Sequence, residues 1–210
     1  MGERRKVHHL YSGGKDSSLA AWILERMGYK VVTVTVTFGF LDNWRHARRT
    51  AETLGFTHEV MRMEKEILER AVDMVMKDGH PNRAIQFLHT KALERLASRE
   101  DVERISDGTR RDDRVPMLGL PEVRSLEDRF GVAYIRPLIG LGYKTIREMV
   151  EDLFLVEIRK SEELEKGDYE VELRHVLRLR GADPLEFFPK GHLQSRVVGW
   201  RRRRGVGGEG

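Results

Sequence analysis

The run VVTVTVTF at residues 31–38 constrains the fold of this chain more than any other segment. It consists of valines and threonines followed by one phenylalanine, and β-branched side chains favour extended backbone over helix. Strands this rich in β-branched residues are typical of sheets that are covered on both faces. The segment therefore predicts a strand that is buried from both sides.

Segments with strand character alternate with segments whose apolar residues recur at helical spacing. Strands are predicted at residues 7–11, 31–38, 58–63, 104–107 and 132–135, and helices at 17–27, 43–54, 64–77, 84–98, 126–130 and 144–159. Such alternation favours a parallel sheet with crossover helices. The expected fold is α/β, a doubly wound parallel five-stranded sheet over residues 1–160. A small C-terminal appendage at 161–205 and a disordered tail at 206–210 are expected to follow.

The composition is that of an ordinary globular protein, and it excludes several classes of chemistry. Of 210 residues, 40% are hydrophobic, 34% are charged and none is cysteine. The chain therefore supplies no disulfide, no cysteine-ligated zinc or iron–sulfur cluster, and no thiol nucleophile or persulfide. Asparagine and glutamine are scarce beside abundant arginine and glutamate, which favours a thermophilic source. No apolar run is long enough for a membrane helix and no apolar segment follows the first residues, so a cytoplasmic protein without a membrane partner is expected.

Basic residues gather at the two ends of the chain. The net charge is +4, and arginine and lysine concentrate within residues 4–6 and after residue 195, which leaves the body near neutral. The run at 200–204 attracts phosphate backbones, and its predicted RNA-binding residues are Arg201, Arg202, Arg203 and Arg204. A solvated tail that keeps the protein soluble is the alternative interpretation of the same run.

The segment SGGKDSS at residues 12–18 stands at the turn from the first predicted strand to the first predicted helix. A connecting turn needs one glycine at most, whereas Gly13 and Gly14 together permit positive φ and close approach of a ligand to the backbone. Their N–H groups and those that open the helix can converge on an anion, which the helix dipole also favours. Lys15 adds a positive charge, and the serines add hydroxyl donors. Because ligands of open parallel sheets bind at the carboxyl ends of strands, this turn predicts a phosphate site.

Neither the P-loop nor the dinucleotide fingerprint is present, but SGGKDS in this context resembles the pyrophosphate loop (PP-loop) of the N-type ATP pyrophosphatases. That superfamily includes GMP, NAD and asparagine synthetases and the tRNA 2-thiouridine and lysidine synthetases. The segments at 46–63, 106–113 and 135–149 resemble later elements of the same fold. The resemblance is greatest to archaeal proteins described as predicted subunits of the tRNA methylaminomethyl-2-thiouridylate enzyme. It implies an adenine nucleotide alpha-hydrolase-like fold and the use of ATP and Mg²⁺ to adenylate a substrate oxygen, after which a nucleophile displaces AMP.

Charge, position and this resemblance assign roles to named residues. The predicted ATP-binding residues are Ser12, Gly13, Gly14, Lys15, Asp16, Ser17, Ser18, Thr37, Gly108, Thr109, Arg110 and Lys144. The predicted catalytic residues are Lys15, Asp16, Ser17 and Asp113. The predicted magnesium ligands are Asp16, Asp112 and Asp113, because hard cations take carboxylate and phosphate oxygens together. Catalysis is expected to rest on positioning and electrostatic stabilisation, with a solvated, salt-bridged loop as the alternative for residues 110–113.

The segment GHPNRAIQFLHTKAL at 79–93 is similar to a thiouridylase segment that begins Pro-Asn-Pro-Cys. Pro81 and Asn82 remain, but Ala84 stands where the reactive cysteine would be. Sulfur would therefore have to arrive on a partner protein or as free sulfide; otherwise the nucleophile is an amine or ammonia. Taken alone, the segment is also explained as a helix start with Asn82 as its N-cap.

The sequence leaves the function open among three interpretations. The first is an ATP-dependent adenylating transferase or ligase that acts on tRNA, with a sulfur-carrier or ammonia-donating protein as partner. The second is an amide- or C–N-forming ligase for a small carboxylate. The third is a regulatory subunit that binds ATP or AMP without turnover. The oligomeric state is open as well, with a homodimer among its options.

Overall fold

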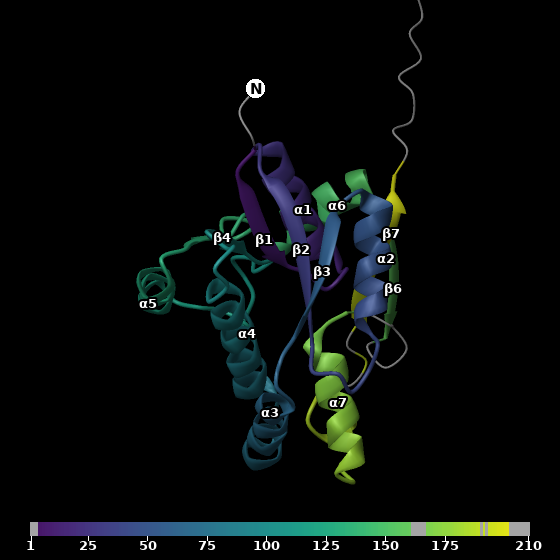
Figure 1. Ribbon diagram of the computed structural model, residues 1–210. Coiled ribbons are helices and arrows are strands. Elements are labelled where there is room, and N and C mark those ends of the chain that lie inside the picture. The colour runs from purple at the N-terminus through teal and green to yellow at the C-terminus, as the bar shows by residue number, and fades with distance from the viewer. Residues whose placement is uncertain (1–3, 161–166, 190, 192, 202–210) are drawn as a thin grey trace, which may run out of the picture.

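The computed structural model describes residues 4–160, 167–189, 191 and 193–201. Its centre is a parallel sheet of five strands in the order β3-β2-β1-β4-β5 (Figure 1). The strands are β1 (Lys6–Leu10), β2 (Lys30–Thr37), β3 (Thr57–Arg62), β4 (Arg104–Ser106) and β5 (Ala133–Ile135). β1 pairs with β2 on one side and with β4 on the other, so the strand order reverses beside β1. The predicted α/β fold is confirmed, and its topological switch point lies where β1 ends.

Helices cover both faces of the sheet. One face is covered by α3 (Lys65–Asp78), α4 (Asn82–Ala97), α5 (Leu120–Phe130) and α7 (Tyr169–Leu179), and the other by α1 (Lys15–Arg26), α2 (Trp44–Leu54) and α6 (Tyr143–Leu153). Along β2, Val32, Val34 and Val36 pack into the first core while Val31 packs into the second. Successive side chains of a strand point to opposite faces, so the β-branched run is buried from both sides as predicted.

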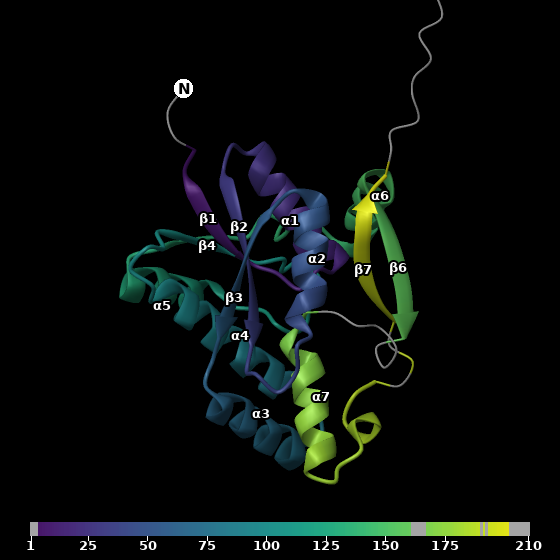
Figure 2. The same cartoon turned by 45° about the vertical axis from the view of Figure 1, so that its right-hand side comes forward.

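The helix predicted at residues 144–159 is shorter in the structure. α6 ends at Leu153 and is followed by β6 (Phe154–Lys160), which pairs antiparallel with β7 (Leu193–Trp200) in a separate two-stranded sheet. The helix prediction for residues 154–159 is therefore wrong. Phe154 and Val197 are fully buried in the core beside α1 and α2, and ladder pairing satisfies the backbone of both strands. Figure 2 shows this β6–β7 ribbon standing beside α2 and α6.

The segment beyond residue 160 packs against the point where β1 ends. α7 buries Leu173, Val176 and Leu177 in the same core as β2, and the short 3-10 helix η1 (Pro184–Glu186) leads on toward β7. The amide of Val197 donates to the carbonyl of Gly13 at 3.0 Å, which ties β7 to the Gly-rich turn. The division into a domain at 1–160 and an appendage at 161–205 stays a prediction, and the predicted tail at 206–210 lies outside the described residues.

The helices of the described part of the chain include none that is long and apolar enough to cross a membrane.

Candidate functional site

The Gly-rich turn has the backbone of an anion cradle. Gly13 has φ +78°, in the left-handed region, and a Cβ there would lie 3.3 Å from the Cα of Ala47 in α2. Gly14 is the N-cap of α1 and has no side chain that could cap the helix; the Gly14 amide lies 3.3 Å from Ser12 Oγ and the Lys15 amide 3.5 Å from Ser195 Oγ. The Ser12 and Ser17 hydroxyls lie 3.3 Å apart beside these amides. Backbone donors and hydroxyls therefore converge at the positive end of the α1 dipole.

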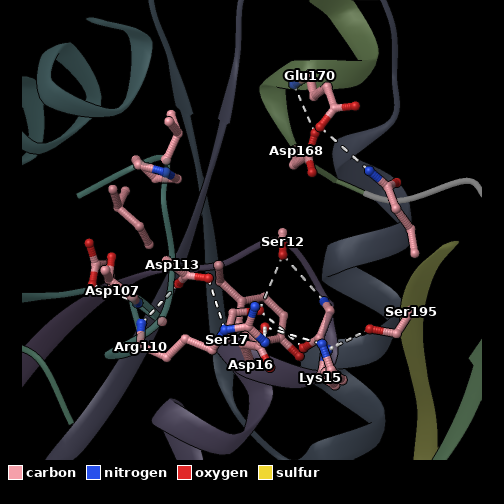
Figure 3. Close-up of a pocket in the computed structure, with 18 of the residues that line it drawn as sticks. Ser12, Lys15, Asp16, Ser17, Asp107, Arg110, Asp113, Asp168, Glu170 and Ser195 are labelled. Carbon is pink, nitrogen blue, oxygen red and sulfur yellow. Dashed lines mark hydrogen bonds and ion pairs between the residues drawn. The ribbon is translucent and has the colours of Figure 1, made fainter. Parts of the chain in front are cut away.

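This turn forms one wall of a cavity of about 1140 Å³. Other walls come from the segment after β4, the start of α7 and β7, with Gly108, Tyr169 and Ser195 among the lining residues. In Figure 3, Asp168 and Glu170 approach the cavity from a different side than Arg110 and Asp113. The volume lies just above the 300–1,000 Å³ of an ordinary small-molecule site, which is enough room for a nucleotide.

Arg110 organises the acidic groups next to the turn. Its Nε lies 2.9 Å from Asp113 Oδ1 and 3.0 Å from Asp112 Oδ1, and its Nη1 lies 3.6 Å from Asp16 Oδ2. Lys15 Nζ lies 3.2 Å from the same Asp16 oxygen. Burial raises the pKa of Asp113, against the lowering effect of the hydrogen bonds from Arg110. Cations and carboxylates thus stand in one cluster beside the phosphate cradle (Figure 3).

One atom of this cluster fits a metal cofactor. The Oδ1 of Asp16 is buried and has no hydrogen-bond partner, and a buried carboxylate oxygen without a partner is costly. Within the described ranges, no group of three or more His, Asp or Glu side chains is placed to hold a metal ion by itself. Asp16 therefore fits a cation that phosphate oxygens help to ligate. Asp112 and Asp113 lie together with it around Arg110, and the assignment of all three as magnesium ligands stays a prediction.

A buried hydrogen-bond network follows β4. Asp107 is 2% exposed; its Oδ2 accepts from His89 Nε2 at 2.7 Å and from the Tyr134 hydroxyl at 2.5 Å, and its Oδ1 accepts from the Thr109 amide at 3.0 Å. His89 Nδ1 lies 2.9 Å from the hydroxyl of Tyr169 in α7. Burial by itself would raise the pKa of Asp107, but the hydrogen bonds from His89 and Tyr134 outweigh it and hold the pKa well below its usual value.

A buried, uncharged histidine contacts the loop that carries the anion cradle. His9 of β1 is fully buried, and its Nε2 lies 2.9 Å from the carbonyl oxygen of Ser17 while its Nδ1 lies 3.1 Å from Ser106 Oγ. Burial lowers the pKa of His9 to about 4. The imidazole therefore stays uncharged at neutral pH and fixes the first turn of α1 against β4.

The structure brings most of the predicted site residues into this cavity. Its lining includes Ser12, Gly14, Lys15, Asp16, Ser17, Gly108, Thr109, Arg110, Asp112, Asp113 and Arg201. Pro81 and Asn82 also line it, whereas Ala84 is buried in the core. The predicted RNA contacts Arg202, Arg203 and Arg204 lie outside the residues that the structure describes.

Four predicted nucleotide contacts are not part of the cavity lining: Gly13, Ser18, Thr37 and Lys144. Gly13 packs on α2 and shapes the turn from behind. The Ser18 hydroxyl lies 2.9 Å from the Tyr11 hydroxyl in the core, and Thr37 donates to Glu172 Oε1 at 3.3 Å. Lys144 is exposed on α6, and Arg147, one helical turn further on, lines the cavity instead.

Sequence reasoning missed the contribution of α7. Asp168, Tyr169, Glu170 and Arg174 all line the cavity. The sequence of residues 161–181 is rich in charged residues and carries no sign of which of them would face a site. The only local signal is Asp168, which caps α7 by accepting from the Glu170 amide at 2.8 Å.

The strand order, the switch-point cavity and the uncapped Gly-rich turn define an adenine nucleotide alpha-hydrolase-like protein of the PP-loop superfamily, as the sequence predicted. Residues 5–199 match the profile of a family described as "Family of unknown function (DUF7411)", and the chain belongs to that family. An uncharacterized protein of Methanocaldococcus jannaschii is 45% identical over 196 residues, which are 93% of this chain and 96% of that protein. A crystal structure described as a predicted subunit of tRNA methyltransferase, from the same organism, is 44% identical with a TM-score of 0.89. The match covers 94% of this chain and 98% of that one.

More distant relatives share only part of their length with this chain. The tRNA-specific 2-thiouridylase MnmA of Wolbachia pipientis is 35% identical over 100 residues, which are 36% of this chain and 27% of that enzyme. The U34-tRNA thiolase NcsA of Methanococcus maripaludis, solved with its [4Fe-4S] cluster, has a TM-score of 0.52 at 19% identity. That match covers 71% of this chain and 57% of NcsA. The likeness to NcsA shows a shared fold.

Proposed function

We propose that this protein is an ATP-dependent adenylating enzyme that cleaves ATP to AMP and pyrophosphate. The observation that supports this most is the Gly-rich turn at residues 12–18, which has no side-chain cap and presents amides, hydroxyls and Lys15 to a cavity large enough for a nucleotide. The activated group would be a substrate oxygen, which sulfur or nitrogen then replaces.

In this proposal the loop amides and the Ser12 and Ser17 hydroxyls bind the β- and γ-phosphates. Lys15 stabilises the charge that develops on departing pyrophosphate. Asp16, with Asp112 and Asp113, holds Mg²⁺, which supplies neutralisation of the phosphate charge when bound. Arg110, which pairs with these carboxylates in the structure, turns its guanidinium to a phosphate oxygen, for which its fork of donors is suited.

We further propose tRNA as the acceptor and the cytoplasm as the place of action. Support comes from the descriptions of the relatives, which are a predicted subunit of tRNA methyltransferase, a U34-tRNA thiolase and a tRNA-specific 2-thiouridylase. Arg201 lines the cavity, and further arginines follow it directly in the sequence. Because this chain has no cysteine, it cannot ligate a cluster through thiolates or carry a persulfide, so the proposal assigns the sulfur to a partner protein or free sulfide.

The test is to incubate the protein with α-labelled ATP, Mg²⁺ and total archaeal tRNA, with sulfide or ammonia as nucleophile. Labelled AMP is expected with tRNA present, and mass spectrometry of the tRNA nucleosides would identify the product. The Lys15→Ala variant should lose AMP release by at least about 100-fold, since charge stabilisation at a transition state is commonly worth that much. Lys77→Ala, which removes an exposed lysine on α3, is the matched control and should keep wild-type turnover.

Tight ATP binding without AMP under any condition would reject the proposal in favour of a regulatory subunit. AMP release with small carboxylates but not with tRNA would instead assign the chemistry to an amide- or C–N-forming ligase.

A further inference from the structure

The hydrogen bonds around Asp107 form a continuous chain along which a proton can move. Asp107, whose pKa is held low, is a carboxylate and only accepts hydrogen bonds, so His89 Nε2 must donate to it. With its hydrogen on Nε2, the His89 ring presents a lone pair at Nδ1, and the hydroxyl of Tyr169, 2.9 Å away, is placed to donate to that nitrogen. The Tyr169 oxygen is thereby left with its acceptor lone pairs unused by His89.

The chain of hydrogen bonds from Asp107 through His89 to Tyr169 runs along the wall of the cavity. Tyr169, His89 and Asp107 all line the cavity, and Tyr169, which is only partly buried, is the most exposed of the three. Both ends of the chain of hydrogen bonds are anchored to the phosphate cradle. Two residues before Tyr169, the amide of Gly167 donates to the Ser12 carbonyl at 3.1 Å. Directly after Asp107, Gly108 packs so closely on α1 that an added Cβ would lie 2.9 Å from the Ser17 amide nitrogen.

We infer that Tyr169, His89 and Asp107 form a proton relay that accepts the proton of the attacking nucleophile. This inference rests on the proposed function and adds to it the residue that touches the second reactant. Tyr169 is the catalytic residue, whereas His89 and Asp107 act through it and are positioning residues. The ligand class for this part of the cavity is a neutral nucleophile that carries a hydrogen, such as ammonia, an amine or hydrogen sulfide.

The step balances in atoms and charge. The nucleophile forms a bond to the carbon that bears the adenylated oxygen, and the bond between that carbon and the oxygen breaks, so that the oxygen and the electron pair leave with AMP. The nucleophile's proton passes to the Tyr169 oxygen as the Tyr169 proton passes to His89 Nδ1. The imidazolium that forms is stabilised by the Asp107 carboxylate 2.7 Å away and returns its proton to water once the product has left.

The fold offers a matched control for this relay. Tyr134 also donates a hydroxyl hydrogen bond to Asp107, yet it is not among the residues that line the cavity. Tyr169→Phe and Tyr134→Phe therefore each remove one hydroxyl from the same network, and only the first removes a group that can touch a reactant.

The experiment measures AMP release under the tRNA assay above for both variants, together with ATP binding by calorimetry and thermal unfolding. Tyr169→Phe is expected to lower turnover by about 100-fold or more, the usual range for a lost acid–base group, with the affinity for ATP unchanged. Tyr134→Phe is expected to stay within about fivefold of wild type. Equal losses in the two variants, or wild-type turnover in Tyr169→Phe, would overturn the relay and leave a purely structural network.

A second readout needs no turnover. Nitrogen-15 NMR of labelled histidine should show the ring hydrogen of His89 on Nε2, and the Nδ1 signal should shift in Tyr169→Phe but not in Tyr134→Phe. A hydrogen on Nδ1 would contradict the relay. If the wild-type protein released no AMP with any acceptor, the adenylating function would fail, whereas AMP release that ignores Tyr169 would overturn the relay alone.

Discussion

At the scale of single residues, Gly108, which follows β4, packs directly against the backbone of the phosphate cradle. A Cβ at this position would lie 2.9 Å from the Ser17 nitrogen and 3.1 Å from the Asp16 carbonyl carbon, so Gly108→Ala must push α1 away. We expect the Kd for ATP to rise at least about tenfold, which corresponds to about 1.4 kcal/mol. Calorimetric titration measures it. Gly140→Ala meets nothing within 4 Å and serves as the control; equal affinities in both variants would refute the close-packing argument.

His9 makes the stability of the protein depend on pH. Its pKa is about 4 in the folded protein against 6.5 for an ordinary histidine, so the unfolded chain binds the extra proton between these values. The contribution of His9 to the free energy of unfolding should therefore be fully present above pH 6.5. As the pH falls toward 4, the free energy of unfolding should decrease by about 1 kcal/mol per pH unit at most. His58, also lowered to about 4 by burial, acts in the same direction. Urea unfolding across this range measures the slope, and His9→Gln should flatten it; an unchanged slope in that variant would show that His9 is not its source.

At the scale of elements, α7 holds the loop after β2 through one carboxylate. Glu172 is fully buried and accepts hydrogen bonds from the amides of Phe38 and Phe40 at 2.9 Å each and from that of Leu41 at 3.3 Å. In the Glu172→Gln variant, the side-chain NH₂ group would face one of these backbone amides, which could no longer donate a hydrogen bond there. The unfolding free energy is expected to fall by about 2–4 kcal/mol, since buried donors lose their acceptor. Denaturant unfolding measures this. Glu148→Gln, on the exposed surface of α6, should change nothing, and a similarly mild effect at Glu172 would contradict the role of this carboxylate.

The elements that follow local pattern were predictable, and those that depend on distant pairing were not. The β-branched run at residues 31–38 predicted β2 to within one residue at each end, because burial on both faces leaves few other residue types. Residues 154–160 instead continue the charged, apolar-spaced pattern of α6, and only the pairing with β7 some forty residues later makes them a strand. No local feature of the sequence indicates that β6 and β7 would pair.

The same distinction holds for the site. Ser12 to Ser17 were predictable because one short segment carries the whole cradle. The network of Asp107, His89, Tyr134 and Tyr169 joins four elements, and each of its residues is ordinary in its own stretch of sequence. Thr37 was assigned to the nucleotide because it ends a strand, and the arrival of Glu172 from α7 gives its hydroxyl a different partner.

At the scale of the whole molecule, the segment after residue 160 completes the core. Phe188 and the buried face of α7 pack in one cluster with Val34 and Val36 of β2. A chain that ends at residue 160 would expose that cluster to water, so we expect it to aggregate or to melt without a cooperative transition. A chain that ends at Arg201 keeps every described element and should unfold at the wild-type midpoint. Differential scanning calorimetry of the two shortened chains measures this. A cooperative transition in the chain that ends at residue 160 would establish residues 1–160 as an independent domain.

The central claim is that the cradle at residues 12–18 directs cleavage between the α- and β-phosphates of ATP. The most direct measurement is phosphorus-31 NMR of the products formed from ATP by the wild-type protein with Mg²⁺, tRNA and a nucleophile. We predict AMP and pyrophosphate in equal amounts, and neither in the Lys15→Ala variant. ADP and orthophosphate as the products would contradict the account, because they would show that the loop presents the γ-phosphate rather than the α-phosphate to attack.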